Sequence, residues 1–307
     1  MIPMAMARQA SLLAVVTALA TGITEAQFIY TTNADNTIGC TGDERALPIP
    51  SVVRIHTDDE GALTIPSQIN GLPVTRINRW GFCGFIRLTS VIIPTGVTNI
   101  GDSAFEYCSS LTNVVIPLGV TKIGKRAFLR CDRLVNIRLP DGVVDIGEGT
   151  FYECVSLTNV VLPNSVKNIG RRAFYLTQLP QVTIPSGVTA IGQEAFCASP
   201  RLARVTIPDG VTDIGKLAFA GCRNLTNVMI GANVTNIESR AFEQNAKLAT
   251  VYFKGDAPRL GEDVFKDDDK ATIYHLPNAI GWGTNFGGRP TAIWNPQTNN
   301  TANTQSK

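Results

Sequence analysis

The 307-residue sequence has few histidines, no long apolar run and little net charge. His56 and His275 are its only histidines, and neither lies beside a nucleophile in a local motif, so a serine or cysteine triad is not expected. A formal net charge of +2 offers no basic face to nucleic acid. No apolar run is long enough to span a bilayer. The sequence therefore predicts a non-enzymatic protein with no catalytic residue, no metal site and no cofactor.

The first 26 residues have the pattern of a secretory signal peptide. Arg8 and the free amine supply a positive start, LLAVVTALA (12–20) the apolar middle, and Thr24-Glu25-Ala26 a cleavage site. We expect the mature chain to be secreted or held at a cell surface, with no membrane span once the signal is removed. At the other end, residues 295–307 are polar and are expected to form a disordered tail without a sorting motif.

A repeat of 23 residues, with one interval of 22, organises most of the chain. Nine of the 13 phenylalanines fall on it: Phe82, Phe105, Phe128, Phe151, Phe174, Phe196, Phe219, Phe242 and Phe265. Isoleucines recur five residues before these phenylalanines, valines three residues before the isoleucines, and leucines six residues after most phenylalanines. A fixed period of this length is typical of a solenoid, in which each coil buries its apolar residues against its neighbours.

Within one coil, LTNVVIP (111–117) alternates as a strand does, and Pro117 ends it because proline cannot donate to a ladder. Gly119, and its equivalents Gly142, Gly187, Gly210 and Asn233, predict a tight turn with positive φ. A second short strand is expected at VTKIG (120–124), and one helical turn at the A-F-x-x-C stretch that follows. The fold class predicted is a solenoid of parallel β-rich coils of about 23 residues with short helical turns.

The repeated pattern L-x-x-V-x-I-P-x-x-V-x-x-I-G-x-x-A-F-x-x-C resembles the BspA-type leucine-rich repeat. The resemblance covers about residues 65–276 and implies a leucine-rich repeat solenoid. Residues 27–64 and 277–294 should cap its two ends, the second with Trp282, Phe286 and Trp294. The resemblance also implies adhesion or protein binding at a cell surface, and no shared catalytic residues.

Seven cysteines in an exported chain suggest disulfides, but the count is odd. Cys108, Cys131, Cys154 and Cys222 share one position of the repeat, which predicts a stack of buried thiols. Cys40, Cys83 and Cys197 lie outside this position, and a disulfide between Cys40 and Cys83 is possible without further support.

For three other motifs we prefer a structural interpretation to a functional one. GWGTNFGG (281–288) lacks the lysine and the setting of a phosphate-binding loop, so we interpret it as cap turns. Asp267-Asp268-Asp269 lacks the spaced oxygen ligands of a calcium loop and is expected to be solvated. The sequons at Asn224, Asn233 and Asn299 matter only in a host that glycosylates.

One coil is strongly basic. Its cations are Lys122, Lys125, Arg126, Arg130, Arg133 and Arg138, and Lys167, Arg171 and Arg172 follow two coils later. The coil between them carries Asp145, Glu148 and Glu153 at matching positions, which predicts ion pairs between coils. Binding of an acidic polysaccharide is the less favoured alternative.

The outward face of the first strand in each coil is the candidate binding surface. The residues that we select there are Asn136, Arg138, Asn159, Arg204, Asn227, Met229 and Tyr252. The competing interpretation is that asparagines stack harmlessly and β-branched residues serve strand propensity. The preferred function is binding of an extracellular or surface protein. A structural or spacer role in an extracellular layer is the alternative, favoured by the polar tail and the lack of an aromatic-rich patch, and a hydrolase is a remote third.

Overall fold

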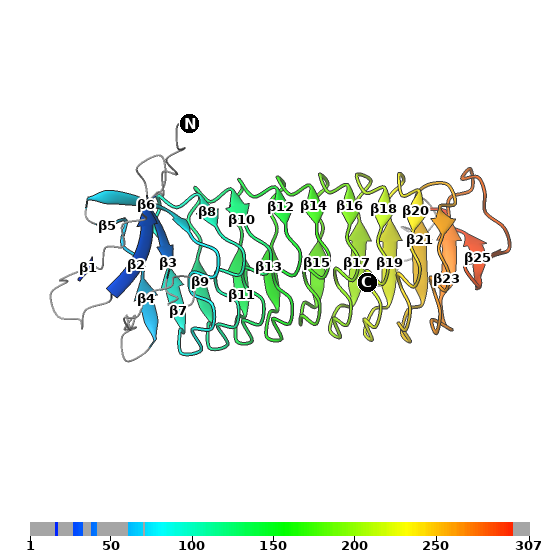
Figure 1. Ribbon diagram of the computed structural model, residues 1–307. Helices are drawn as coiled ribbons and strands as arrows, with labels where there is room; N and C mark the ends of the chain where they lie inside the picture. The colour runs from blue at the N-terminus through cyan, green and yellow to red at the C-terminus, as the bar shows by residue number, and fades with distance from the viewer. Residues whose placement is uncertain (1–15, 18–26, 33–37, 42–60, 70, 297–307) are drawn as a thin grey trace, which may run out of the picture.

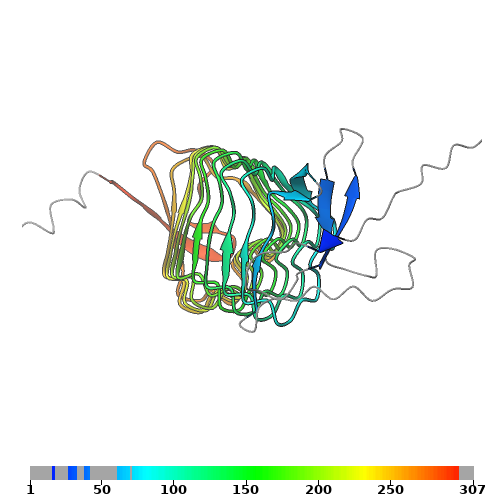
Figure 2. The ribbon, with the colours of Figure 1, turned by 90° about the vertical axis from the view of Figure 1, so that its left-hand side faces the viewer.

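The computed structural model describes residues 16–17, 27–32, 38–41, 61–69 and 71–296. The coils stack side by side along one axis, from the N-terminal strands at one end to β25 (Arg289–Ile293) at the other (Figure 1). Seen along that axis, successive coils overlie one another (Figure 2). Of the predicted signal segment only Val16–Thr17 is described, as β1, so that prediction and the predicted tail lie almost wholly outside the described residues.

Each coil contributes one strand to a first row, formed where the sequence alternates between buried and outward residues. Its strands are β4 (Ala62–Thr64), β7 (Ser90–Ile92), β9 (Asn113–Val115), β11 (Asn136–Arg138), β13 (Asn159–Val161), β15 (Gln181–Thr183), β17 (Arg204–Ile207), β19 (Asn227–Ile230), β21 (Thr250–Phe253), β23 (Thr272–His275) and β25. Three parallel hydrogen-bonded ladders connect strands of this row. They join β4, β7 and β9, then β11 and β13, and then β15, β17, β19, β21, β23 and β25. The pairing is in register, so equivalent residues of successive coils are neighbours.

A second row consists of two-residue strands preceded by the longer β6. Its strands are β6 (Leu72–Ile77), β8 (Asn99–Ile100), β10 (Lys122–Ile123), β12 (Asp145–Ile146), β14 (Asn168–Ile169), β16 (Ala190–Ile191), β18 (Asp213–Ile214), β20 (Asn236–Ile237) and β22 (Arg259–Leu260). Beyond β6 the row continues through β3 (Ile38–Thr41), β2 (Gln27–Thr32) and β1. β3 is parallel to β6, while β2 is antiparallel to β3. β5 (Gln68–Ile69) is also antiparallel to β6.

The repeated phenylalanines form one continuous stack through the core, as the spacing predicts. All nine are fully buried. Neighbouring rings lie nearly parallel, with centroids 5.2 to 5.7 Å apart. Burial of each ring contributes about 1.5–3 kcal/mol relative to exposure, and in-register stacking lets every ring contact the equivalent ring of the next coil.

The third side of each coil consists of turns, so the predicted helical turns are wrong: the described residues contain no α-helix. Each run of turns carries two residues with positive φ, four positions apart. The pairs are Trp80 and Gly84, Ser103 and Tyr107, Arg126 and Arg130, Gly149 and Glu153, Arg172 and Leu176, Glu194 and Ala198, Leu217 and Gly221, Arg240 and Gln244, and Asp263 and Asp267. Because of these reversals, every second N–H points out of its own coil.

These outward N–H groups donate to the next coil. In one coil the pairs are Ser103 N to Lys125 O, Phe105 N to Ala127 O and Tyr107 N to Leu129 O, each 2.8 Å. Some of the intervening N–H groups close turns within the coil, as from Glu106 to the carbonyl of Ser103 at 3.2 Å. A non-glycine residue in the left-handed region costs about 1–2 kcal/mol, and hydrogen bonds to the next coil offset it. In a helix all N–H groups point along the helix axis, whereas here alternate N–H groups point to the next coil, which is why turns are found instead.

The turn after the first strand is present, but the predicted positive φ is not. The N–H of Val120 donates to the carbonyl of Pro117 (3.1 Å), so the tight turn spans residues 117–120. Gly119 and its equivalents do not have positive φ. The reason for glycine is close approach instead. A Cβ at Gly210 would lie 2.4 Å from the carbonyl oxygen of Ser186 in the preceding coil.

The cysteine column is buried as predicted. Each thiol donates to a phenylalanine carbonyl of the preceding coil. The pairs are Cys108–Phe82, Cys131–Phe105, Cys154–Phe128 and Cys222–Phe196, with S···O distances of 3.0 to 3.2 Å. Thr177, Ser199, Asn245 and Asp268 occupy the equivalent buried positions of four other coils, and Phe85 occupies that of the first coil. From Cys108 onward the column is therefore a row of small polar side chains inside the core.

The segment expected to form the C-terminal cap contains β24 (Asn285–Phe286) and β25, which are antiparallel to each other. GWGTNFGG supplies its turns, and Gly281, Gly287 and Gly288 have positive φ. The rings of Trp282 and Phe286 pack on Phe253, with centroids 4.9 and 5.8 Å away. Within the described residues, no helix is long and apolar enough to cross a membrane.

Candidate binding surface

The first row presents two outward columns of side chains, where the alternation of the strands predicts them. In β9, β11, β15 and β17 the central valine or isoleucine is buried and its neighbours are exposed. Parallel in-register pairing repeats this arrangement about every 4.8 Å, so the columns run the length of the array. The result is one continuous surface whose chemistry changes from coil to coil.

The selected residues fall into two groups on this surface. Asn136 pairs with Asn159 and Arg138 with Val161, on β11 and β13. The second group lies on β17, β19 and β21, where Arg204 pairs with Asn227 and Met229 with Tyr252. β15 separates the two groups, with Gln181 and Thr183 facing outward. The structure therefore places all seven selected residues on one face, but in two clusters.

The N-terminal part of the face is partly apolar. Ile92, Val115 and Val161 are about half exposed, and Arg138 lies between the two valines in the same column. Exposed single β-branched residues are ordinary on a strand. This part alone does not indicate a binding site.

The C-terminal part carries an aromatic patch, formed by Met229, Tyr252, Tyr274 and Trp294. The ring of Tyr252 stacks on Tyr274 (centroids 4.9 Å) and contacts Trp294 (5.0 Å, tilted by 59°). All four side chains are partly exposed. This corrects the expectation that the chain lacks an aromatic-rich patch. Trp294, which was expected to belong to the C-terminal cap, lies against outward-facing Tyr252. The sequence could have indicated the patch through Tyr274, which lies one repeat after Tyr252. No sequence pattern placed Trp294 beside them.

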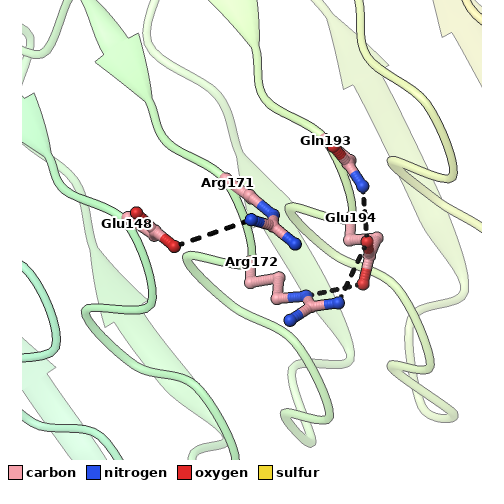
Figure 3. A network of polar contacts seen from close by, with 5 residues as sticks. All are labelled: Glu148, Arg171, Arg172, Gln193 and Glu194. Atoms are coloured by element: carbon pink, nitrogen blue, oxygen red, sulfur yellow. Dashed lines mark hydrogen bonds and ion pairs between the residues drawn. The ribbon is translucent and has the colours of Figure 1, made fainter.

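The basic coils carry ion pairs between coils, as the matching charges predict. Arg130 lies 3.2 Å from Glu153, and Arg171 lies 3.9 Å from Glu148. A stronger contact, which the sequence did not indicate, joins Arg172 to Glu194 in the next coil (Figure 3). Its guanidinium donates from Nε at 2.7 Å and from Nη2 at 3.3 Å.

Glu194 is nearly buried and fully engaged. Gln193 donates to its Oε1 at 2.7 Å, beside the two bonds from Arg172 (Figure 3). Burial alone would raise the pKa of the Glu194 carboxyl, but the hydrogen bonds from Arg172 and Gln193 outweigh it, and the pKa is lowered. Of the nine cations in these coils, Arg130, Arg171 and Arg172 form such ion pairs. Binding of an acidic polysaccharide stays the less favoured prediction.

The remaining candidates are the column cysteines, the aspartate run and the histidines. Burial raises the pKa of the column thiols, that of Cys222 to about 12, so these cysteines are unreactive while folded. Asp267 and Asp269 are exposed as predicted, but Asp268 is fully buried, which corrects the solvated-loop interpretation for that residue. His275 stacks flat on Trp282 (5.0 Å). His56 and the side chain of Cys40 lie outside the described residues, so the Cys40–Cys83 disulfide stays a prediction.

The stacked coils, the in-register strands and the phenylalanine column define a parallel β-solenoid built from leucine-rich repeats. The model of the BspA type leucine rich repeat region, which contains six copies, matches residues 75–203 and 144–272. Together the two matches cover more than half of the 307 residues. The chain belongs to the BspA-type leucine-rich repeat family.

Solved structures agree with this assignment. A leucine-rich repeat protein from Bacteroides ovatus is similar with a TM-score of 0.57 and 23% identity, over 89% of this chain and 67% of that protein. The T. pallidum leucine rich repeat protein is similar with a TM-score of 0.51 and 28% identity, over 76% of this chain and 91% of that one. No curated protein matches the chain. These likenesses support the fold and leave the ligand open.

Proposed function

We propose that the chain is a secreted or cell-surface protein-binding module, and that a partner protein docks on the outward face of the first row. The family is one of repeat proteins that commonly mediate protein interactions, which supports the general role. The predicted signal peptide supports export, and adhesion is one form the role can take.

The observation that carries the proposal is the aromatic patch together with Arg204. Tyrosine, tryptophan, methionine and arginine are enriched where protein interfaces contribute most binding energy. Tyr252 and Trp294 support each other, so few rotamers are lost on binding. This also weakens the structural or spacer alternative, because the lack of an aromatic-rich patch was one of its two grounds, beside the polar tail.

The test replaces Arg138, Arg204, Met229 and Tyr252 by serine in one variant. Outward side chains contribute little to the core, so the circular dichroism spectrum should stay native, and the two arginine sites should each change stability by about 0.5 kcal/mol or less. Tyr252→Ser also loses the ring contacts with Tyr274 and Trp294, which should cost about 0.5–1.5 kcal/mol for each pair. For a purified surface protein that the unaltered chain binds, the Kd of this variant should be at least tenfold higher.

The matched control lies on the second row: Lys122, Asn168, Asn236 and Arg259, all changed to serine. It also removes two cations and two neutral side chains, so net charge is equal in both variants. Loss of binding in the control with retention in the first variant would overturn the proposal. Assembly of the pure protein without any foreign partner, unaffected by the first variant, would favour the spacer role.

A further inference from the structure

The runs of turns on the third side of the coils form a surface that we call the turn face. Four positions of each coil contribute to it: those three and two residues before the repeated phenylalanine and those one and two residues after it. From the coil of Phe82 to the coil of Phe219, the sign of their charge alternates from each coil to the next. In chain order the charged residues are Arg79; Asp102 and Glu106; Lys125, Arg126 and Arg130; Glu148 and Glu153; Arg171 and Arg172; Glu194; and Lys216. Figure 3 shows opposite charges of three successive coils side by side.

Four charges of the turn face form no ion pair among the described residues: Asp102, Glu106, Lys125 and Arg126. They lie on two adjacent coils, and all four side chains are exposed or partly exposed. The carboxylate of Asp102 accepts the backbone N–H of Lys125 at 2.9 Å, which positions the carboxylate without neutralising it. These charges are therefore available to a partner.

The same end of the turn face carries exposed aromatic rings. Trp80 is 41% exposed and Tyr107 is 47% exposed, and Tyr152 is partly exposed. The guanidinium of Arg79 lies over the ring of Trp80, 3.9 Å from its centroid. Ion pairing between neighbouring coils needs no outward ring, whereas tryptophan, tyrosine and arginine are enriched at protein interfaces. The rings therefore indicate that this end of the face contacts another protein.

The alternation of charge selects the partner. A polyanion or a polycation would meet a repulsive coil about 4.8 Å from each attractive one. A second copy of the chain carries the same alternation. If a two-fold axis perpendicular to the face passes between two neighbouring coils, each alternating coil faces a coil of opposite sign, whereas an axis through a coil would bring like signs together. The turn face is therefore complementary to itself in the first arrangement.

We propose that two copies of the chain associate through their turn faces, antiparallel, about a two-fold axis between the two coils that hold the unpaired charges. Asp102 and Glu106 of each copy then face Lys125 and Arg126 of the other copy. The charges that the array leaves unpaired are thus paired across the interface.

The extent of the contact follows from the position of the axis. One coil further out on each side, the coil of Trp80 faces the coil of Tyr152, so the exposed rings lie within the contact. A contact of about four coils, about 4.8 Å apart, is smaller than a standard interface, so the Kd should be on the order of 10–100 µM at low salt.

The association closes at two copies, because both use the same face. It therefore differs from the open-ended assembly that a layer requires. The first row lies on another side of each coil and stays free, so the dimer presents two aromatic patches to a partner protein.

The test uses two charge-reversed variants of the purified chain. The acidic variant carries Lys125→Glu and Arg126→Glu, and the basic variant carries Asp102→Lys and Glu106→Lys. Sedimentation equilibrium measures the dimer at about 0.02 M and about 0.5 M salt. Circular dichroism checks that each variant is folded.

The unaltered chain should dimerise at low salt, with a Kd on the order of tenfold higher at high salt. Each variant alone should dimerise at least tenfold more weakly, since like charges then face each other across the axis. An equal mixture of the two variants should dimerise again, because the acidic coils of one then face the basic coils of the other. Ion pairing within one chain cannot produce this recovery, since mixing leaves the charges of each chain unchanged.

The matched controls make the same changes of net charge on the second row. They are Lys122→Glu with Arg259→Glu, and Asp145→Lys with Asp213→Lys, all at exposed side chains. Each control, and the four-serine variant of the first row, should keep the Kd of the unaltered chain within about twofold.

The inference fails if the unaltered chain stays monomeric at low salt well above the expected Kd, or if a reversed variant dimerises as well as the unaltered chain. It also fails if the mixture dimerises no better than its components, or if a second-row control loses the dimer to the same extent. Loss of the dimer in the four-serine variant would place the contact on the first row and refute the turn face. Docking of a foreign protein is measured below the Kd of the dimer, so either proposal can fail while the other stands.

Discussion

Asp268 should make the C-terminal coil more stable in mild acid than at neutral pH. It occupies the cysteine column, where Cys222 and Asn245 donate to a phenylalanine carbonyl of the preceding coil. An ionised carboxylate has no proton to donate. Its Oδ1 accepts the N–H of Asn245 at 2.6 Å, and its Oδ2, fully buried, has no partner among the described residues. Burial therefore raises the pKa of Asp268 to about 7.

The direction of this pH dependence follows from the coupling between proton binding and folding. In the unfolded chain the pKa of Asp268 returns to about 3.9, so between pH 4 and pH 7 the folded state holds a proton that the unfolded state has lost. Stability therefore falls as the pH rises through this window and is level on either side. At about 1.4 kcal/mol per pH unit, the whole window corresponds to about 4 kcal/mol, and the part between pH 5 and pH 8 to about 3 kcal/mol.

The assay is urea unfolding followed by tryptophan emission, since Trp282 and Trp294 both lie at this end. Asp268→Asn keeps an acceptor for Asn245 and gains an amide that can donate as Asn245 does. We expect this variant to be more stable than the unaltered chain at pH 8, by about 2–4 kcal/mol, and the gain to shrink to about 1 kcal/mol or less at pH 5.

The control is Asp213→Asn, whose difference from the unaltered chain should not vary in this way. A gain from Asp268→Asn that is equal at pH 5 and pH 8, or a loss at pH 8, would refute the reasoning. Titration of the Asp268 carboxyl carbon by NMR measures the pKa directly.

Phe151→Ala should lower the free energy of unfolding by about 3–5 kcal/mol, and Phe265→Ala by less, because Phe265 has a ring on one side only and cap backbone on the other. Equal losses in urea unfolding would contradict the stacked core. The four column cysteines should resist a thiol reagent in the folded protein and all react once it is denatured without reductant; blocked thiols would mean disulfides. Glu194→Gln should cost about 1–2 kcal/mol at pH 7 and less as the pH falls below the usual range of a glutamate, since its lowered pKa gives stability that is lost as acid protonates the folded carboxyl. A loss that does not diminish in acid would assign the effect to packing.

The repeat made most of the core predictable from the sequence. A period of 23 residues can bring Phe105 beside Phe128 only if coils stack in register, and that one inference also places the cysteine column and both outward columns. The short interval between Phe174 and Phe196 did not disturb the stack, because Thr177 keeps the column position and the missing residue falls after it.

The turns could not be predicted because their stability comes from other coils. Arg126 and Leu176 have positive φ, which neither residue type favours. The hydrogen bonds to the next coil offset the energetic cost of that conformation. Asp268 was assigned to solvent for a related reason: an aspartate run suggests exposure, whereas the period places its middle residue in the core column. The aromatic patch required knowing that Trp294 lies over Tyr252, and the cap that brings them together does not follow the repeat.

In-register stacking also fixes the spacing between surface positions on different coils. Each coil meets its neighbours through the same columns of isoleucine and phenylalanine, so a gene that gained or lost one whole unit of 23 residues would still join Ile to Ile and Phe to Phe at the new junction. Such a change between β13 and β19 would move the aromatic patch relative to Arg138 by about 4.8 Å per unit and keep both columns in register. The distance between two contact points for a large partner can therefore change in fixed steps, independently of the residues that make the contacts.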